Sequence, residues 1–239
     1  MGQTVSISFF RFGSLRHRLW ALWMMGAARL SLSRLPDLGF WKLCGSGTGE
    51  GFTPLPNTAV YAVIATWPNE SVARARILES RVFERYRTKA AETWTVFLAP
   101  LSSRGEWSGS QPFVPAGADQ ASEKDERHRP MAALTRATIR PSILMRFWRR
   151  VPDISSAIGQ DRNVAFKIGL GEVPWLHQVT FSIWPDALKM AQFARTGAHA
   201  EAIQAVRSEG WFREELYARF EVTSDVGTWD GSSPLEVLK

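Results

Sequence analysis

One histidine in this sequence has the surroundings that a buried metal ligand requires. His199 begins a helical pattern whose apolar residues follow at intervals of three, four and seven: Ala202, Ile203 and Val206. A histidine on such an apolar face is by default a hydrogen-bonded core residue. A single imidazole in an apolar pocket is also what haem iron needs as its fifth ligand, with the sixth position left open for oxygen. We predict His199 as a metal ligand and keep the core residue as the alternative.

Comparison of the two halves of the chain favours the ligand. Residues 67–94 and residues 184–211 have the same length, and each span begins with Trp-Pro and ends with Trp. When one span is laid on the other, Val82 falls opposite His199. The Trp-Pro turn and the final tryptophan belong to both copies and are explained by a shared fold. The imidazole belongs to one copy, which indicates a function rather than a structural role.

Cationic residues are the candidates for pairing with the propionates of such a cofactor. Arg207 lies in the same helical region as His199, and Arg195 and Arg219 are further candidates. From the first half of the chain, the groups nominated to face the site are Lys42, Trp41 and the glycine-rich segment that follows them. The predicted cofactor contacts are therefore His199, Lys42 and Arg207, while the residues that act directly on a substrate stay unassigned.

A glycine-rich segment follows Lys42. Glycine occupies every second position from Gly45 to Gly51. No Gly-Lys-Ser/Thr follows, and no third glycine stands three residues after the second, so the phosphate-loop and dinucleotide fingerprints are excluded. Alternating glycines allow close approach of backbone to a ligand or movement of a lid. A flexible hairpin connection is the simpler interpretation.

The elements that must position these residues follow one order twice. Alternating and β-branched patterns predict strands at residues 4–12, 40–44, 58–66 and 94–100, with helices at 15–33 and 70–91. The second half repeats this with strands at 132–140, 164–169, 175–183 and 216–222, and helices at 141–158 and 186–207. By this alignment Lys167 corresponds to Lys42.

Each half therefore has the order β-α-β-β-α-β of a ferredoxin-like unit. Two such sheets can cover each other, so we predict an α+β fold of tandem ferredoxin-like repeats packed as a pseudo-twofold barrel or sandwich. The predicted parts are residues 1–110, a linker at 111–131 that is rich in proline and charge, and residues 132–239. A ligand would bind between the sheets or beside them.

Composition narrows the class of partner. The 239 residues carry 45% hydrophobic residues, 11 Trp and 14 Phe, which suit a ring-rich core or a pocket for a long apolar ligand. The single cysteine excludes an internal disulfide and a thiolate metal cluster, and it favours a reducing cytoplasm. The formal charge of +6 comes from scattered rather than clustered basic residues, so nucleic acid is not expected. An acidic redox partner or an anionic membrane surface is the better expectation.

The predicted helix at 15–33 bears on the membrane question. Its apolar residues have helical spacing, and arginines flank them: Arg16, Arg18, Arg29 and Arg34. A core helix packed on a sheet is the default, and a face that dips into a bilayer interface is the alternative. No signal-peptide pattern and no run of 18 apolar residues are present, so we expect a cytoplasmic protein, with peripheral contact at a membrane surface as an open alternative. Oligomer formation stays open.

Three stretches carry a resemblance to a known family. They are residues 8–54, which contain FWKL and the glycine-rich segment, residues 60–68 (VYAVIATWP), and residues 199–231, which contain EGWFREELYARF. They resemble the spheroidene monooxygenases, the carotenoid ketolases of purple photosynthetic bacteria. The likeness covers nearly the whole chain outside the predicted linker.

The resemblance implies an oxygen-dependent oxidation of an acyclic carotenoid. In this family spheroidene is oxidised at C-2 of its methoxylated end by successive hydroxylations and loss of water, which gives the ketone spheroidenone. The family is thought to use haem and electrons from a ferredoxin-type donor. Two alternatives stay open from the residues themselves: a non-catalytic module that binds haem or an apolar ligand, and a cofactor-free oxygenase of the same fold.

Overall fold

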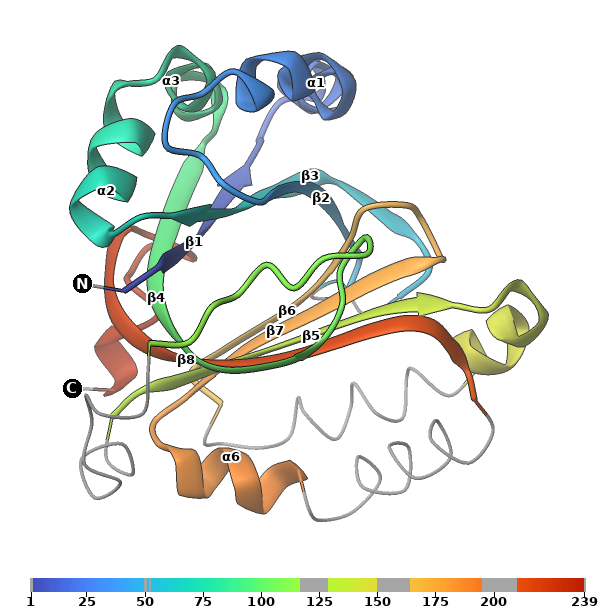
Figure 1. Ribbon diagram of the computed structural model, residues 1–239. Helices are drawn as coiled ribbons and strands as arrows, with labels where there is room; N and C mark the ends of the chain where they lie inside the picture. The colour runs from blue at the N-terminus through green and yellow to red at the C-terminus, as the bar shows by residue number, and fades with distance from the viewer. Residues whose placement is uncertain are drawn as a thin grey trace.

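The computed structural model describes residues 2–49, 51, 53–116, 129–149, 164–194 and 210–238. These residues form one closed barrel of antiparallel strands in the order β1-β3-β2-β6-β7-β5-β8-β4. Figure 1 shows helices α1, α2 and α3 over one side of this barrel and α6 on the opposite side. The α+β class and the barrel are therefore confirmed.

The strands of the first half are β1 (Thr4–Arg11), β2 (Trp41–Gly47), β3 (Pro56–Trp67) and β4 (Glu92–Gly105). Those of the second half are β5 (Met131–Ile139), β6 (Phe166–Gly171), β7 (His177–Trp184) and β8 (Phe212–Gly227). Each of the eight overlaps a predicted strand. β4 and β8 extend well beyond their predicted ends, because they pair with each other from Trp94↔Gly227 to Gly105↔Leu216.

The described helices are α1 (Leu15–Ser33), α2 (Glu70–Glu79), α3 (Arg81–Lys89) and α6 (Ala187–Ala194), with short 3₁₀ turns η2 (Pro141–Ile143) and η3 (Glu236–Leu238). Residues 144–149, which follow η2, are also helical. α1 has its predicted bounds, and the Ser14 hydroxyl accepts a hydrogen bond from the His17 N–H as an N-cap.

The single helix predicted at residues 70–91 is wrong, because the chain forms α2 and α3 instead. Ser80 between them has extended backbone, with φ −75° and ψ 136°. The Arg87 guanidinium turns back and donates to the carbonyl oxygens of Ile77 and Leu78 at the end of α2. These bonds satisfy carbonyls that a continuous helix would have bonded itself.

The same strand order occurs in each half of the barrel. The first half has the order β2-β3-β1-β4 and the second has β6-β7-β5-β8. The halves meet along the long β4–β8 pair and along a short β2–β6 pair at Gly45↔Gly171 and Ser46↔Leu170. The ferredoxin-like assignment and the division at 111–131 stay predictions, since residues 117–128 and much of the second half's predicted helices lie outside the described residues.

Large side chains fill the interior of the barrel. Every strand contributes buried apolar residues to one cluster. At its centre Phe9 stacks on Trp94 with ring centroids 5.3 Å apart, and Trp94 meets Phe166 at 4.6 Å. Because these rings pack against one another inside the barrel, the outer faces of its strands are the better candidates for binding a ligand.

The two outer sides of the barrel are built differently. On the first half, α1, α2 and α3 pack on the sheet through an extensive buried cluster that includes Phe10, Tyr61 and Val63. On the second half, the buried cluster consists of Met131, Trp184 and Met190, with α6 contributing the last of these. Among the described residues the second half therefore has the less apolar outer side.

Candidate functional site

Two rows of outward-facing residues cross the four strands of the second half. One row is formed by Lys167↔Ser182, Ser182↔Ala133 and Ala133↔Arg219, and the next by Gly169↔Thr180, Thr180↔Thr135 and Thr135↔Tyr217. Their strand neighbours, such as Ile168 and Phe181, belong to the interior cluster, and successive residues of a strand point to opposite faces. We call these eight residues the second-half face.

The second-half face carries small, hydroxyl-bearing and cationic side chains. The corresponding side of the first half carries Phe10, Leu43, Tyr61 and Val63, which are buried under the helices. Thr135, Thr180 and Lys167 are only partly buried, and Arg219 is exposed. Such a face can receive a flat ligand, and it offers hydroxyl donors and positive charge to an anionic group.

The predicted residues His199 and Arg207 lie outside the described residues. The helix that precedes them, α6, packs at the edge of the second-half face, where Met190 joins Trp184. The ring of Trp184 lies 5.1 Å from that of Phe193, and its indole N–H donates to the Ser182 hydroxyl at 3.0 Å. The roles assigned to His199 and Arg207 stay predictions.

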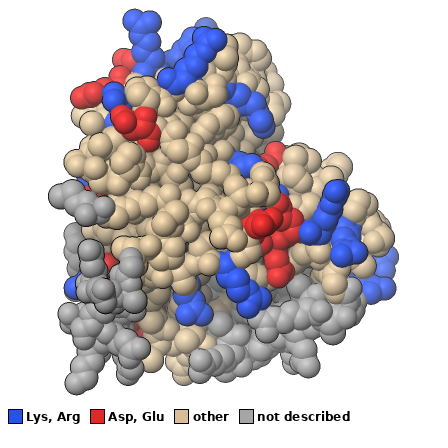
Figure 2. Space-filling model, viewed as in Figure 1, with Lys and Arg blue, Asp and Glu red and all other residues tan. Residues whose placement is uncertain are grey.

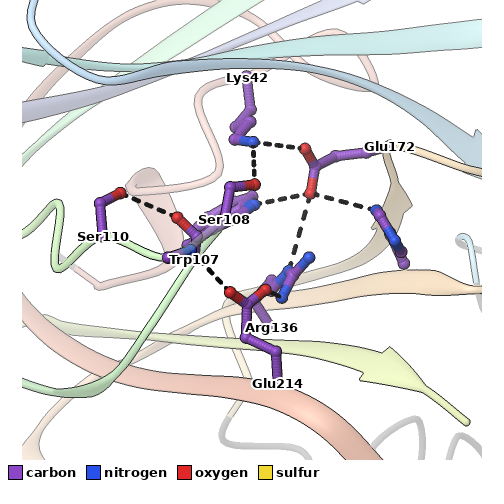
Figure 3. Close-up of polar contacts among 9 residues, drawn as sticks. Lys42, Trp107, Ser108, Ser110, Arg136, Glu172 and Glu214 are labelled. Atoms are coloured by element: carbon purple, nitrogen blue, oxygen red, sulfur yellow. Dashed lines mark hydrogen bonds and ion pairs between the residues drawn. The ribbon is translucent and has the colours of Figure 1, made fainter.

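Lys42 lies at one end of the barrel in a group of charged residues, of which Arg136 is buried and the others are partly buried (Figure 3). Its ammonium is 2.9 Å from Glu172 Oε2 and donates to Ser108 Oγ at 2.6 Å. Glu172 Oε1 accepts a hydrogen bond from the Trp107 indole at 2.6 Å. Arg136, with 1% of its side chain exposed, pairs with Glu214 and lies 3.7 Å from Glu172. We call Lys42, Arg136, Glu172 and Glu214 the barrel-end cluster.

Lys42 and Lys167 do not occupy corresponding places, contrary to the prediction. Lys42 pairs in register with Ile64 of the interior, whereas Lys167 pairs with Ser182 of the second-half face. The alignment by sequence is shifted by one residue relative to the sheet, and a shift of one residue moves a side chain to the opposite face. Lys42 is bound to Glu172, and its predicted contact with a cofactor stays a prediction.

Two similar turns close the two ends of the barrel, and each binds the other half of the chain. In residues 105–110 the N–H of Gly109 donates to Glu214 Oε1 at 2.8 Å, and in residues 227–232 the N–H of Gly231 donates to Glu92 Oε1 at 2.8 Å. Each carboxylate also pairs with an arginine, Arg136 in one case and Arg11 in the other. Each turn therefore binds a carboxylate from the other half of the chain.

The electrostatics of the barrel-end cluster keep Glu214 ionised. Burial by itself would raise the pKa of Glu214, but backbone hydrogen bonds from Gly109 and Ser108 and the Arg136 charge together lower it. The pKa of His177, whose Nδ1 lies 3.9 Å from Glu172, is lowered by burial and by the positive charge of Arg136. A neutral imidazole thus stands beside two ion pairs.

The arrangement of the barrel-end cluster indicates a structural role. Its two cations and two carboxylates balance in charge, and every carboxylate is engaged. His177, the first residue of β7, is partly buried at the edge of this cluster. The sequence prediction missed Arg136, Glu172 and Glu214. The repeated Gly-X-Trp-X-Gly pattern of the two turns was the available signal.

The glycine-rich segment serves a close contact between backbones. A Cβ added to Gly51, whose φ is +91°, would lie 1.8 Å from the carbonyl oxygen of Gly169 in β6. Nearby, the Ser46 hydroxyl donates to that same carbonyl oxygen at 2.8 Å. The segment therefore joins the first half to the second, and its glycines allow the approach.

Comparison with known proteins gives relatives along the whole chain. No family model matches the sequence. The spheroidene monooxygenase of Cereibacter sphaeroides is 50% identical over 235 residues, covering 98% of this chain and 71% of the relative. That of Rhodobacter capsulatus is 48% identical over 96% of this chain and 94% of the relative, and that of Rubrivivax gelatinosus is 35% identical over 90% and 80%.

Solved structures show the fold. An aldoxime dehydratase in complex with butyraldoxime superposes with a TM-score of 0.64 at 10% identity, over 99% of this chain and 85% of that one. A second aldoxime dehydratase gives 0.59 at 12% identity, over 94% and 84%. Within the described residues, no helix has the length and apolarity needed to cross a bilayer. On the identity and coverage of the three relatives, the chain belongs to the spheroidene monooxygenase family and is an oxidoreductase of the monooxygenase class.

Proposed function

We propose that this protein is a haem-dependent monooxygenase that oxidises C-2 of an acyclic carotenoid, converting spheroidene to spheroidenone by successive hydroxylations. Oxygen and a reduced ferredoxin-type donor are the co-substrates. The observation that carries the proposal is the 50% identity to a spheroidene monooxygenase over 98% of the chain. We interpret the barrel, with the same strand order in each half, as tandem ferredoxin-like repeats.

The second-half face fits the haem part of the proposal. The small side chain of Ala133, beside the partly buried Thr135 and Thr180, leaves room for a flat macrocycle against the sheet, and Lys167 and Arg219 bring positive charge for its propionates. His199 would hold the iron, and Arg207 and Lys42 are the further proposed contacts. Haem, when bound, supplies the one-electron and oxygen chemistry that protein side chains lack.

The chain's own residues would bind and orient the substrate and exclude water. A polyene partitions into apolar surroundings, so its reacting end must be brought to the site by apolar contacts and fixed there by a few polar groups. The formal charge of +6 favours encounter with an acidic electron donor. Peripheral contact with the photosynthetic membrane belongs to the same proposal, because a polyene dissolves in the bilayer and not in water.

The haem assignment is tested by the absorption spectrum of purified protein and of two histidine variants. The wild type should show a Soret band, and His199→Ala should lose it. His177→Ala is the matched control and should keep the band, because the imidazole of His177 lies beside Glu172 at the barrel end. An unchanged band in His199→Ala would refute the role of His199 as axial ligand. Loss of the band in His177→Ala would assign that role to His177.

The reaction itself is tested by supplying spheroidene, oxygen and reduced ferredoxin to the holoprotein and measuring the ketone product. The proposal expects spheroidenone together with the hydroxylated intermediate. Binding of carotenoid without product would instead indicate a non-catalytic module. Turnover by colourless protein would indicate a cofactor-free oxygenase.

A further inference from the structure

Helix α1 presents an apolar face to solvent. Five large side chains of this helix are exposed, at 71%, 59%, 55%, 61% and 59%: Leu15, Leu19, Leu22, Trp23 and Leu30. The residues that α1 buries against the sheet and α3 lie on its opposite side: Ala21, Met24, Ala28 and Leu32. A surface helix ordinarily turns polar residues outward, so this second apolar face indicates that something covers it.

The exposed side chains form one continuous ridge. Leu15, Leu19 and Leu22 follow at intervals of four and three, which puts them on one line along the helix, and Trp23 and Leu30 lie beside that line. α1 has 19 residues and is therefore about 28 Å long. It is among the outermost elements on its side of the molecule, away from the barrel (Figure 1).

Positive charge surrounds this ridge. Arg16, Arg18, Arg29 and Arg34 flank it, and the first 36 residues of the chain contain no aspartate or glutamate. The first acidic residue, Asp37, is already paired with Arg76 at 2.7 Å. Lysine and arginine side chains are prominent over the helices at the top of the space-filling view (Figure 2). Apolar side chains with a tryptophan and flanking arginines are the composition of helices that lie in the interface of anionic membranes.

We propose that the outward face of α1 docks on an anionic lipid bilayer. The helix lies in the plane of the interface, with Leu19, Leu22 and Trp23 at the headgroup–acyl boundary and the arginines at the lipid phosphates. A second copy of this chain fits the face less well, because pairing two α1 faces would bring two sets of arginines together without an acidic residue between them. Only the purpose of this docking, which is the supply of an apolar substrate, rests on the proposed function.

Vesicle sedimentation of the full chain tests the docking. We expect binding to phosphatidylcholine vesicles that contain phosphatidylglycerol, and much weaker binding to phosphatidylcholine alone. Leu19→Ser with Trp23→Ser should raise the lipid concentration for half binding by about tenfold per residue, since each loses most of its transfer free energy. The matched control is Met145→Ser with Val237→Ser, two side chains that are each 73% exposed elsewhere, and it should bind as the wild type does.

Each outcome decides the proposal. Absence of wild-type binding to anionic vesicles, or equal binding by the α1 double variant, would refute it. A wild-type dimer that this variant converts to a monomer would assign the face to a second copy instead. Turnover of carotenoid in detergent separates this proposal from the proposed reaction, because the α1 variant should keep full activity there. Failure of the wild type in that assay would count against the reaction and leave the docking result standing.

Discussion

Removing the charge of Glu214 tests the structure at the barrel-end cluster. Glu214→Gln keeps the shape of the side chain and leaves Arg136, which is 1% exposed, without its paired carboxylate. Breaking a buried pair in this way costs about 3 to 5 kcal/mol of unfolding free energy. We expect about 3 kcal/mol, because Glu172 remains 3.7 Å from the Arg136 Nε and compensates in part.

The other end of the barrel supplies the control for this variant. Glu92→Gln removes the same charge from the equivalent turn, where Gly231 takes the place of Gly109. Its partner Arg11 is 33% exposed and keeps its ion pair with Asp230. A pair that solvent reaches contributes about 1 kcal/mol or less. The two variants should therefore differ in stability by about 2 kcal/mol.

Urea unfolding of the two variants and the wild type measures this difference. With a slope of about 3 kcal/mol per molar urea, Glu214→Gln should lower the midpoint by about 1 M and Glu92→Gln by about 0.3 M or less. Replacing both members of the buried pair, Glu214→Gln with Arg136→Met, should recover part of the loss, since no buried charge is then unpaired. Equal midpoints for the two single variants would refute the idea that burial decides the cost.

The pH dependence of the same comparison follows from the lowered pKa of Glu214. A carboxyl group whose folded pKa is depressed stabilises the protein above its unfolded pKa of about 4.3, and that contribution is lost as the pH falls through the folded value. The wild type and Glu214→Gln should therefore differ by a constant amount near neutral pH and converge in acid.

Three further predictions follow from single residues. The pKa of His177 is lowered in the folded protein, so the unfolded chain binds a proton at this residue first as the pH falls below about 6.5. The stability of the wild type should therefore decrease over this pH range. His177→Phe should remove this contribution, as measured by urea titrations at pH 5 to 7. Cys44 is fully buried with a raised pKa, so a thiol reagent should modify it only after urea unfolds the protein, and rapid labelling of folded protein would contradict its burial. Gly51→Ala should destabilise by more than about 2 kcal/mol because its Cβ would strike Gly169, whereas Gly109→Ala, with φ +70° and open space, should cost about 1 kcal/mol in the same thermal melts.

Local chemistry explains why part of the fold was predictable. β1 alternates in its side chains and ends one residue before its predicted end, and α1 begins at a serine cap and has its predicted bounds. β4 and β8 were predicted too short, because their ends contain ordinary polar residues. β4 has 14 residues and β8 has 16 because the two strands pair with each other as neighbours in the barrel.

The burial of the charged residues at the candidate site could not be predicted from local sequence. Charged residues such as Arg136, Glu172 and Glu214 are scattered along the chain, and from sequence each would be expected on the surface. Closure of the barrel brings them together, and the turn at residues 105–110 then covers them. Their burial is a property of the contacts between distant segments.

Local sequence pattern and likeness to relatives were enough to predict the family, the α+β class, the repetition of one strand order and the helix α1. Which face each strand buries became known from the pairing of the strands in the barrel. A shift of one residue reverses the faces of a strand, so Lys42 turns into the barrel and Lys167 turns out of it. The structure also shows which apolar side of α1 packs on the sheet and which apolar side is exposed to solvent.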